Sequence, residues 1–537
     1  MRQTIPALSL AVLLIPASVS AATPAPQTTS RAVPTALKAR ITRIETGFAP
    51  IPVSGQEPLR LDVQKLMKMY NVPGLSVAVI DDYRIAWAKG YGVTAPGGDT
   101  PVDVRTLFQA GSLSKPVATA GTLYLVQTGK LSLDEDVDRK LTSWHVPASD
   151  YSHDQKVTLR RIMSHSAGFN VHGFDGYDVD APRPTLLQVL DGVPPANSPS
   201  VKLEHVPGSE WHYSGGGVLV EQQLVLDVSH MSFPAFMQQT VFDKLGMQDS
   251  TYEQPLPAAR AAHAARGTYF DGKPVHGGWH VYPEMAAAGL WSTPTDLAKY
   301  SIEIARAKQG KSTRVLSKQM ATEMLTPQMP RVEENTWGDA EHPDQMGLGF
   351  FLGDATRPDR FGHVGDDEGF QALMIMFGDT GQGAVIMANS AQGIRVGEML
   401  LNNIAEEYAW HYVPPLGKVS VNTALYAVAK FRGLPAALDM YQRLKQQPDP
   451  AKPVDRKTLI NLGYNLSWGG DMPDAIRAMQ QDAQENPDYW NAYDSLGEMY
   501  MMSGDKQKAI ENYTRSVQLN PDNQGGKDAL RDLQGQH

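Results

Sequence analysis

The sequence predicts an α+β domain followed by an all-α domain of helical repeats. Two observations lead to this division. Apolar stretches typical of strands lie near both ends of the region from about residue 50 to residue 412, with helical and turn-rich sequence between them. Beyond this region long helical patterns dominate, and a motif recurs at a spacing of 34 residues. We therefore expect an antiparallel sheet flanked by helices, a helical lobe from the middle of the domain, and a row of helix–turn–helix units.

The strands of the first domain are predicted from short runs of β-branched and other apolar residues bounded by turns. They come from opposite ends of the domain, so the sheet should bring distant parts of the chain together. The predicted strands are Ser76–Ile80, Ile85–Ala88, Phe370–Phe377 and Ala384–Ala388. The expected boundaries place this domain at residues 46–412 and a Pro- and Gly-containing linker at residues 413–423.

The N-terminal residues are typical of a secretory signal peptide. Arg2 precedes an apolar stretch from Ile5 to Val19, and Ala21 fits the small residue before a cleavage site. The stretch is too short for a spanning helix and contains prolines, so a membrane anchor is the weaker interpretation. We expect residues 1–21 to be removed, residues 22–45 to form a flexible leader, and the mature protein to be periplasmic or secreted without a membrane span.

Composition excludes several classes of function. The 537-residue chain has no cysteine, which rules out disulfides, a cysteine nucleophile and thiolate metal sites. Its 48 Lys and Arg against 58 Asp and Glu give a net charge of −10, which argues against nucleic acid as a partner. The histidines show no metal-ligand spacing, so neither a metal nor another cofactor is expected.

The segment 424–537 is predicted to be a set of repeats. Small residues keep register at the 34-residue spacing, and a proline ends each unit. This pattern resembles the tetratricopeptide repeat, in which small residues allow two helices to approach closely. The paired positions are Gly463 with Gly497, Ala475 with Ala509, and Pro487 with Pro521; a degenerate unit is expected at Ala424–Leu444 and a capping helix at Asp528–Leu533. A plain helical bundle is the alternative. The resemblance implies that these repeats serve either as a binding surface for a protein partner or as a structural appendage.

Ser112 and Lys115 form a candidate nucleophile pair in the first domain. Residues three apart share one face of a helix, and Pro116 is tolerated only in the first turn, so a helix should begin near Ser112. A serine at a helix start has a free amide to hold an oxyanion, and an adjacent amine can assist its deprotonation. The same spacing recurs at Ser503 and Lys506 inside a repeat, so the pair alone is weak evidence.

Two further segments follow in order and strengthen the prediction that the Ser112–Lys115 pair is catalytic. They are Tyr213-Ser214-Gly215 and His363-Val364-Gly365. Together with Ser112–Lys115 they resemble the three motifs of the class C β-lactamase-like serine hydrolases, a family that also includes D-Ala-D-Ala carboxypeptidases, D-aminopeptidases and esterases. The resemblance covers roughly residues 50–410. It implies the β-lactamase/penicillin-binding-protein transpeptidase-like fold.

The resemblance also implies a role for each motif. Ser112 would be the acyl-forming nucleophile, and Lys115 would assist its deprotonation. Tyr213 would carry a proton between nucleophile, leaving group and attacking water. The amides of Ser112 and Asp366 would form the oxyanion hole, where each donor is worth roughly 2.7–4 kcal/mol. The segment His276-Gly277-Gly278 also fits the third motif, but it precedes a landmark that the family places before that motif, so His363 is preferred.

Two departures from the family pattern bear on the substrate. The second motif ends in Gly215 where an Asn is common, and the third begins with His363 where true β-lactamases have a lysine. Both changes weaken features suited to β-lactams. We therefore expect a small-molecule or short-peptide substrate, first a D-amino-acid peptide or an ester, and second a β-lactam. A non-catalytic receptor for cell-wall fragments, with the repeats recruiting a partner, is the rival hypothesis.

Overall fold

A central antiparallel sheet organises the first domain. The computed structural model describes residues 34–329, 343–357, 359–410, 419–446 and 454–535. Within this part of the chain, seven strands pair in the order β2-β1-β9-β8-β7-β6-β5, and β3 and β4 form a separate two-stranded ladder. The strands are β1 (Gly74–Asp81), β2 (Arg84–Gly92), β3 (Phe108–Gln109), β4 (Trp291–Ser292), β5 (Gln345–Met346), β6 (Phe351–Leu352), β7 (Arg360–Asp367), β8 (Phe370–Phe377) and β9 (Gln382–Ala388).

The sheet joins the two ends of the domain, as the sequence predicted. Strand β1 pairs with β9 so that Val77 lies opposite Ile386, although the two residues are far apart in sequence. Successive residues of β1 are buried on both faces of the sheet. Val77 packs into one core with the N-terminal helices, whereas Ala78 packs into a second core on the opposite face. The alternation of side chains along a strand thus supplies two separate cores from one apolar run.

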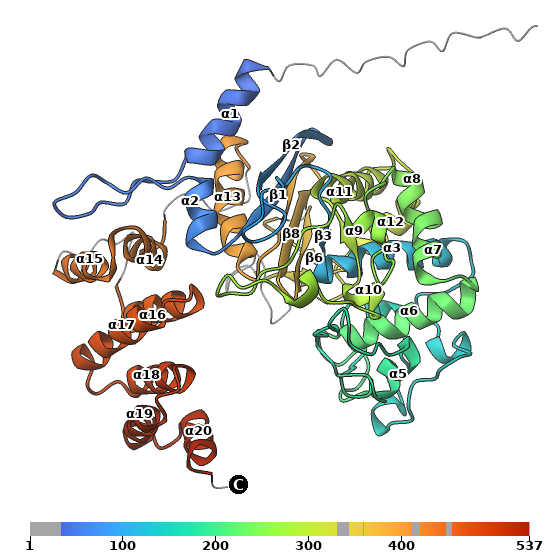
Figure 1. Cartoon of the computed structure of the whole chain (residues 1–537). Coiled ribbons are helices and arrows are strands. Elements are labelled where there is room, and N and C mark those ends of the chain that lie inside the picture. The colour runs from blue at the N-terminus through green and yellow to red at the C-terminus, as the bar shows by residue number, and fades with distance from the viewer. Residues whose placement is uncertain (1–33, 330–342, 358, 411–418, 447–453, 536–537) are drawn as a thin grey trace, which may run out of the picture.

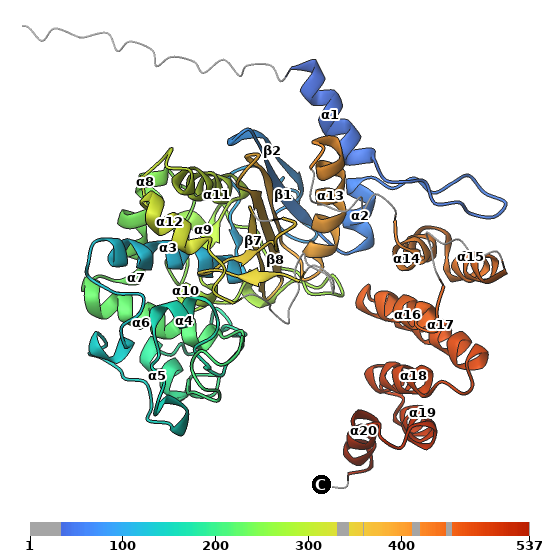
Figure 2. The ribbon, with the colours of Figure 1, turned by 180° about the vertical axis from the view of Figure 1, so that it is seen from behind.

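Three helices cover one face of the sheet (Figures 1 and 2). They are α1 (Thr35–Thr46), α2 (Val63–Met69) and α13 (Gly393–Glu407), and α13 contacts β8, β9 and both other helices. The residues 35–45 that were expected to be flexible therefore form most of α1. Ile44 is fully buried, and Arg43 pairs with Glu407 of α13. A helix with one buried apolar residue and a charged exterior is hard to separate from a linker by composition alone.

The other face of the sheet carries α11 and a helical lobe. Helix α11 contacts β1, β2, β8 and β9, and the lobe extends from it on the side away from α13 (Figure 1). These elements are α3 (Ser114–Gln127), α4 (Leu159–Met163), α5 (Leu186–Asp191), α6 (Gly215–Ser229), α7 (Phe233–Met237), α8 (Asp243–Leu245), α9 (Ala258–Ala261), α10 (Met285–Ala288), α11 (Pro294–Lys308) and α12 (Lys318–Met324). The α+β fold with a helical lobe is confirmed.

The C-terminal region forms a row of helix pairs that descends from the α13 side of the sheet (Figure 2). Within each full pair the helices touch at a glycine, because a Cβ at Gly463 would lie 2.6 Å from Met479 and one at Gly497 would lie 3.1 Å from Tyr513. The predicted degenerate unit and capping helix are both helical. The helices are α14 (Val421–Arg432), α15 (Leu434–Gln446), α16 (Thr458–Trp468), α17 (Met472–Glu485), α18 (Trp490–Met502), α19 (Lys506–Leu519) and α20 (Gln524–Gln534).

The repeats are packed onto the first domain through α14 and α16. The Tyr426 hydroxyl donates a 3.0 Å hydrogen bond to the Met69 carbonyl at the end of α2, and the Tyr426 ring lies 5.5 Å from that of Tyr70. Arg395 of α13 donates to the Asn465 side chain at 2.7 Å. The linker prediction of residues 413–423 lies mostly outside the described residues, but α14 begins at Val421, inside that range. The repeats and the sheet therefore share one continuous apolar core.

The described residues include no helix that is both long enough and apolar enough to cross a membrane. The predicted signal peptide, residues 1–21, lies outside the described residues, so its prediction stays untested.

Candidate active site

Ser112 lies where the chain passes from β3 into α3. Strand β3 pairs with β4, and the chain then makes a single 3-10 turn over Gly111–Leu113 before α3 begins at Ser114. The helix thus starts two residues after Ser112, close to the predicted position. The Ser112 side chain is half-buried, whereas Gly111 and Leu113 on either side of it are buried. The turn is held by a strand ladder on one side and a helix on the other, and this fixes the position of the hydroxyl.

Lys115 points back to Ser112 across one helical turn. Its Nζ donates a 2.8 Å hydrogen bond to Ser112 Oγ and a 2.9 Å hydrogen bond to the Ala287 carbonyl of α10. The side chain is only 3% exposed. Because the sequence spacing says nothing about α10, the Ala287 carbonyl was not predicted. The amine is therefore oriented by a second element and is placed within proton-transfer distance of the serine.

Tyr213 stands directly before the helix that carries the second motif. Ser214 is the N-cap of α6, where its Oγ accepts from Gly217 N at 3.0 Å. The Lys115 Nζ lies 5.0 Å from the centre of the Tyr213 ring. Gly215 opens α6, and a Cβ there would stand 3.0 Å from the Phe174 ring. The cap thus fixes the tyrosine beside the Ser112–Lys115 pair.

Two histidines pack on the ring of Tyr213. The ring centres of His165 and His172 lie 4.2 and 4.8 Å from that of Tyr213. His165 Nδ1 accepts a 3.2 Å hydrogen bond from Ser214 N, and burial, with a smaller contribution from Lys115, holds the pKa of His165 well below its usual value. His165 is therefore neutral and braces the second motif.

The third motif lies on β7, in the part of that strand beyond its short pairing with β6. A Cβ at Gly365 would fall 2.0 Å from the Ala110 carbonyl and 3.2 Å from Ser112 N, and a Cβ at Gly111 would fall 2.5 Å from Asp366 N. Gly111 also has a positive φ of 51°. Two glycines are thus required where the strand and the nucleophile turn touch. This contact brings the amides of Ser112 and Asp366 close together.

His363 carries no charge in this site. Its Nδ1 donates a 2.6 Å hydrogen bond to the Val364 carbonyl, and its buried Nε2 has no hydrogen-bond partner among the described residues. Burial, assisted by Lys115, lowers the pKa of His363 to about 3. The competing His276 lies instead on an exposed turn beside Asp180. His363 therefore supplies no cation to this site, and its unprotonated Nε2 is buried.

Asp367 is a buried residue next to the site that sequence reasoning missed. Its Oδ2 accepts a 3.0 Å hydrogen bond from Gly111 N, which ties β7 to the nucleophile turn. Burial and then the neighbouring Asp366 raise the pKa of Asp367 well above its usual value. The Asp366 side chain is exposed to water, and partial desolvation by its surroundings raises its pKa to about 6. Only the position directly after the third motif could have drawn attention to these carboxyls.

Among the residues that the structure describes, no group of three or more His, Asp or Glu side chains is arranged to hold a metal ion. The groups that the site itself brings together include the Ser112 hydroxyl, the Lys115 amine and the Tyr213 ring.

Comparison with known proteins identifies the class. The family model described as Beta-lactamase matches residues 59–409, and the model described as Tetratricopeptide repeat matches residues 490–523. The chain therefore belongs to the Beta-lactamase family, a family of hydrolases with a common fold, and it carries a tetratricopeptide repeat.

The curated relatives differ in activity. The chain is 27% identical to the unguisins hydrolase ungD of Aspergillus violaceofuscus, over 44% of this chain and 43% of that protein. It is 27% identical to penicillin-binding protein 4* of Bacillus subtilis over 37% and 42% of the two chains. It is 26% identical to esterase EstB of Burkholderia gladioli over 37% and 51%. The matches thus span only about two fifths to half of the length of these relatives.

Solved structures show the same fold. The octameric penicillin-binding protein homologue from Pyrococcus abyssi superposes with a TM-score of 0.51 at 21% identity, over 72% of this chain and 80% of that chain. A β-lactamase/D-alanine carboxypeptidase from Yersinia pestis, solved with citrate, gives a TM-score of 0.51 at 18% identity over 64% and 95%. At these identities the likeness establishes the fold alone.

Proposed function

We propose that this protein is a serine hydrolase that cleaves an amide or ester bond through an acyl-enzyme on Ser112. The observation that carries the proposal is the 2.8 Å contact between Ser112 Oγ and the Nζ of Lys115, a buried lysine. An amine at this distance can lower the cost of ionising the hydroxyl or take its proton. The family supports hydrolysis, and the site residues are our assignment.

The proposed reaction has two half-reactions. Ser112 Oγ attacks the substrate carbonyl carbon while its proton passes to Lys115 and Tyr213, and the amides of Ser112 and Asp366 hold the oxyanion. Collapse breaks the bond to the leaving group, which takes the proton. Water then attacks the carbonyl carbon of the ester on Ser112 while its proton passes to the same groups. Collapse breaks the bond between that carbon and Oγ, releases the acid and returns the proton to Ser112 Oγ. In each half-reaction one proton leaves the attacking hydroxyl or water, and one proton is delivered to the departing group.

The neutral state of His363 favours peptides and esters over β-lactams as substrates. A β-lactam carboxylate needs a fixed cation, and a histidine whose pKa is lowered to about 3 does not provide one near neutral pH. D-Amino-acid peptides or esters therefore rank first. β-Lactam hydrolysis is the second candidate, because a β-lactamase from Pseudomonas fluorescens is 26% identical over 44% of this chain.

The location and domain roles follow from the sequence. Residues 1–21 support export to the periplasm or medium, and the repeats support binding of a protein partner. We propose that the hydrolase domain begins at α1 rather than at residue 46 and ends near residue 412, and that the repeats span residues 424–537.

A covalent adduct tests the proposal. Wild-type protein should be labelled by a fluorophosphonate probe and should hydrolyse nitrophenyl esters, and Ser112→Ala should lose both. Ser503→Ala is the matched control, because Ser503 has the same spacing to Lys506 but hydrogen-bonds the Tyr500 carbonyl in a repeat. Turnover that persists in Ser112→Ala would refute the nucleophile. A wild-type protein that binds penicillin without turnover would favour the receptor hypothesis.

A further inference from the structure

Helix α10 carries the carbonyl that orients Lys115, although this helix has only four residues. The Ala287 carbonyl accepts from Lys115 Nζ at 2.9 Å. A helix of this length has little stability of its own, because it makes few internal hydrogen bonds and its first amides have no partner within it. Within the described part of the chain, the side chain of the preceding Glu284 does not cap α10. Contacts from other elements must therefore fix the position of the Ala287 carbonyl.

Gln222 of α6 supplies such contacts through both ends of its side-chain amide. Its Oε1 accepts a 2.8 Å hydrogen bond from Ala286 N in the first turn of α10. Its Nε2 donates a 3.2 Å hydrogen bond to the carbonyl of Pro283, just before the helix. The side chain is 2% exposed, so a rotation of the amide would leave buried polar groups unpaired. Gln222 thus caps α10 from a neighbouring helix, one residue before the carbonyl that accepts from Lys115.

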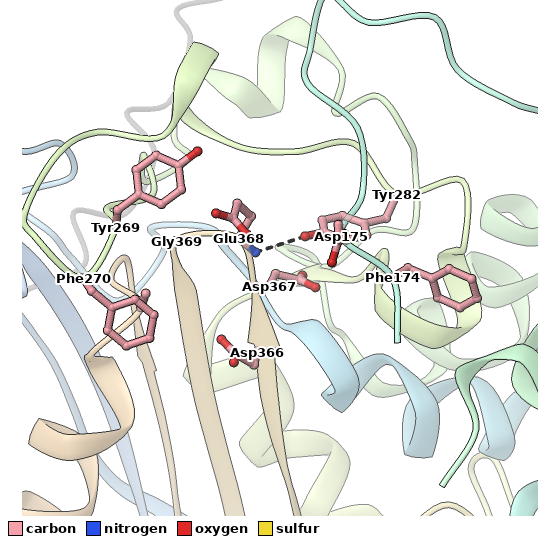
Figure 3. A pocket seen from close by; sticks show the side chains of 10 residues that line it. Phe174, Asp175, Tyr269, Phe270, Tyr282, Asp366, Asp367, Glu368 and Gly369 are labelled. Atoms are coloured by element: carbon pink, nitrogen blue, oxygen red, sulfur yellow. Dashed lines mark hydrogen bonds between the residues drawn. The ribbon is translucent and has the colours of Figure 1, made fainter. Parts of the chain in front are cut away.

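The segment that contains α10 is anchored separately at its two ends. At one end, the Tyr282 hydroxyl accepts a 3.0 Å hydrogen bond from Glu368 N at the turn between β7 and β8, the contact drawn in Figure 3. At the other end, Leu290 N donates a 3.0 Å hydrogen bond to Ser114 Oγ, beside the nucleophile. Both anchors are independent of Gln222. Loss of the glutamine would therefore displace the middle of the segment and leave the nucleophile turn in place.

We propose that Gln222 is a positioning residue for the reaction and acts through α10 on Lys115. The inference rests on the proposed function, because it requires Lys115 to assist the deprotonation of Ser112. Helix α6 begins directly after the Tyr213-Ser214 step and reaches Gln222 about two turns later, so one helix supports both the second motif and the lysine. A catalytic group that is misplaced by about 1 Å costs roughly 10²-fold in rate, so the cap has a direct consequence for acylation.

Two adjacent glutamines give a matched test. Gln222→Met keeps the size of the side chain and removes both hydrogen bonds to the α10 segment. Gln223→Met is the control, because Gln223 is also buried but donates to Asp227 within α6, at 2.9 Å. Hydrolysis of p-nitrophenyl acetate in single turnover, with enzyme in excess, gives the rate constant of acylation and the dissociation constant of the ester separately.

We expect Gln222→Met to lower the acylation rate constant by about tenfold or more and to leave the dissociation constant unchanged, because the lysine acts on the serine and not on binding. Gln223→Met should leave both constants unchanged, although the two variants should lower the midpoint of thermal unfolding to a similar extent. Gln222→Glu should recover most of the rate, since a buried carboxyl is neutral and offers the same acceptor and donor as the amide.

A double variant separates positioning from general damage to the fold. Lys115→Met removes the amine that Gln222 positions, so adding Gln222→Met to it should not reduce the residual rate of fluorophosphonate labelling any further. A purely structural role of the glutamine would instead reduce labelling by the same factor with and without the lysine.

Two results would overturn the inference. One is an acylation rate constant of Gln222→Met equal to that of Gln223→Met, and the other is an equal loss of labelling on both backgrounds. Each of these refutes only the role of Gln222 when wild-type protein is acylated and Ser112→Ala is not. A wild-type protein that no fluorophosphonate labels and that releases no nitrophenol refutes the proposed function itself.

Discussion

Lys115 Nζ lies 2.8 Å from Ser112 Oγ and is held there by the Ala287 carbonyl at 2.9 Å. The amine thus has one contact that positions it and one that can act in the reaction. Because the side chain is buried, its interaction with the serine is not weakened by water as a surface pair would be. This geometry makes Lys115 the most informative residue to change after the serine.

Lys115→Met should lower kcat/KM for a nitrophenyl ester by roughly 10²–10⁴-fold, because general acid–base assistance is lost. The methionine keeps an unbranched chain of similar length, so the domain should still fold. Steady-state kinetics and the rate of fluorophosphonate labelling measure the effect. Lys130→Met is the control, since Lys130 is exposed just beyond the other end of α3. Equal activity of the two variants would remove Lys115 from the mechanism.

The contact of β7 with the nucleophile turn gives a second prediction. Gly365→Ala would place a Cβ 2.0 Å from the Ala110 carbonyl, so strand and turn must separate. We expect at least a tenfold loss of kcat/KM and a lower midpoint of thermal unfolding. Gly378→Ala is the matched control, because its nearest neighbour lies at an ordinary 3.4 Å. An active Gly365→Ala variant would show that the two amides need not be so close.

The sequence was sufficient where local pattern determines structure. The apolar runs predicted β8 with the bounds that the structure has, and the 34-residue spacing placed Gly463 where two helices touch. It could not supply contacts between distant segments. The Ala287 carbonyl on Lys115, and Asp367 beneath Gly111, depend on how α10 and β7 pack against the nucleophile turn. Residues 35–45 failed as a leader because α1 is stabilised mainly by packing on α13, which its own composition does not reveal.

A buried carboxyl in α6 gives a prediction about pH. Glu221 is fully buried, and burial raises its pKa to about 7 from the usual value near 4.5. The folded state therefore binds more protons than the unfolded state between about pH 4.5 and 7, and this part of the stability is lost as pH rises through that window. Glu221→Gln removes the titration. The free energy of unfolding of the variant minus that of wild type should therefore be more favourable at pH 8 than at pH 5, by about 1–3 kcal/mol.

Urea unfolding at the two pH values measures this difference, and Glu57→Gln serves as the exposed control. Burying the glutamine amide would lower the variant's free energy of unfolding equally at pH 5 and pH 8, so this cost cancels when the two pH values are compared. A difference between Glu221→Gln and wild type that is the same at pH 5 and pH 8 would contradict the assigned burial effect.

The junction of α2 and α14 determines whether the two domains unfold together. Tyr426 is buried, donates to the Met69 carbonyl at 3.0 Å, and packs against Tyr70. Tyr426→Phe keeps the ring but leaves the carbonyl without its donor, which should cost about 1–3 kcal/mol. Tyr426→Ala also removes the ring and should cost about 3–5 kcal/mol.

Wild-type protein should therefore show one calorimetric transition, and Tyr426→Ala two, with the repeats unfolding first. Tyr151→Phe, at an exposed position, should leave the single transition in place. Two transitions already present in wild type would mean that the shared core does not couple the domains.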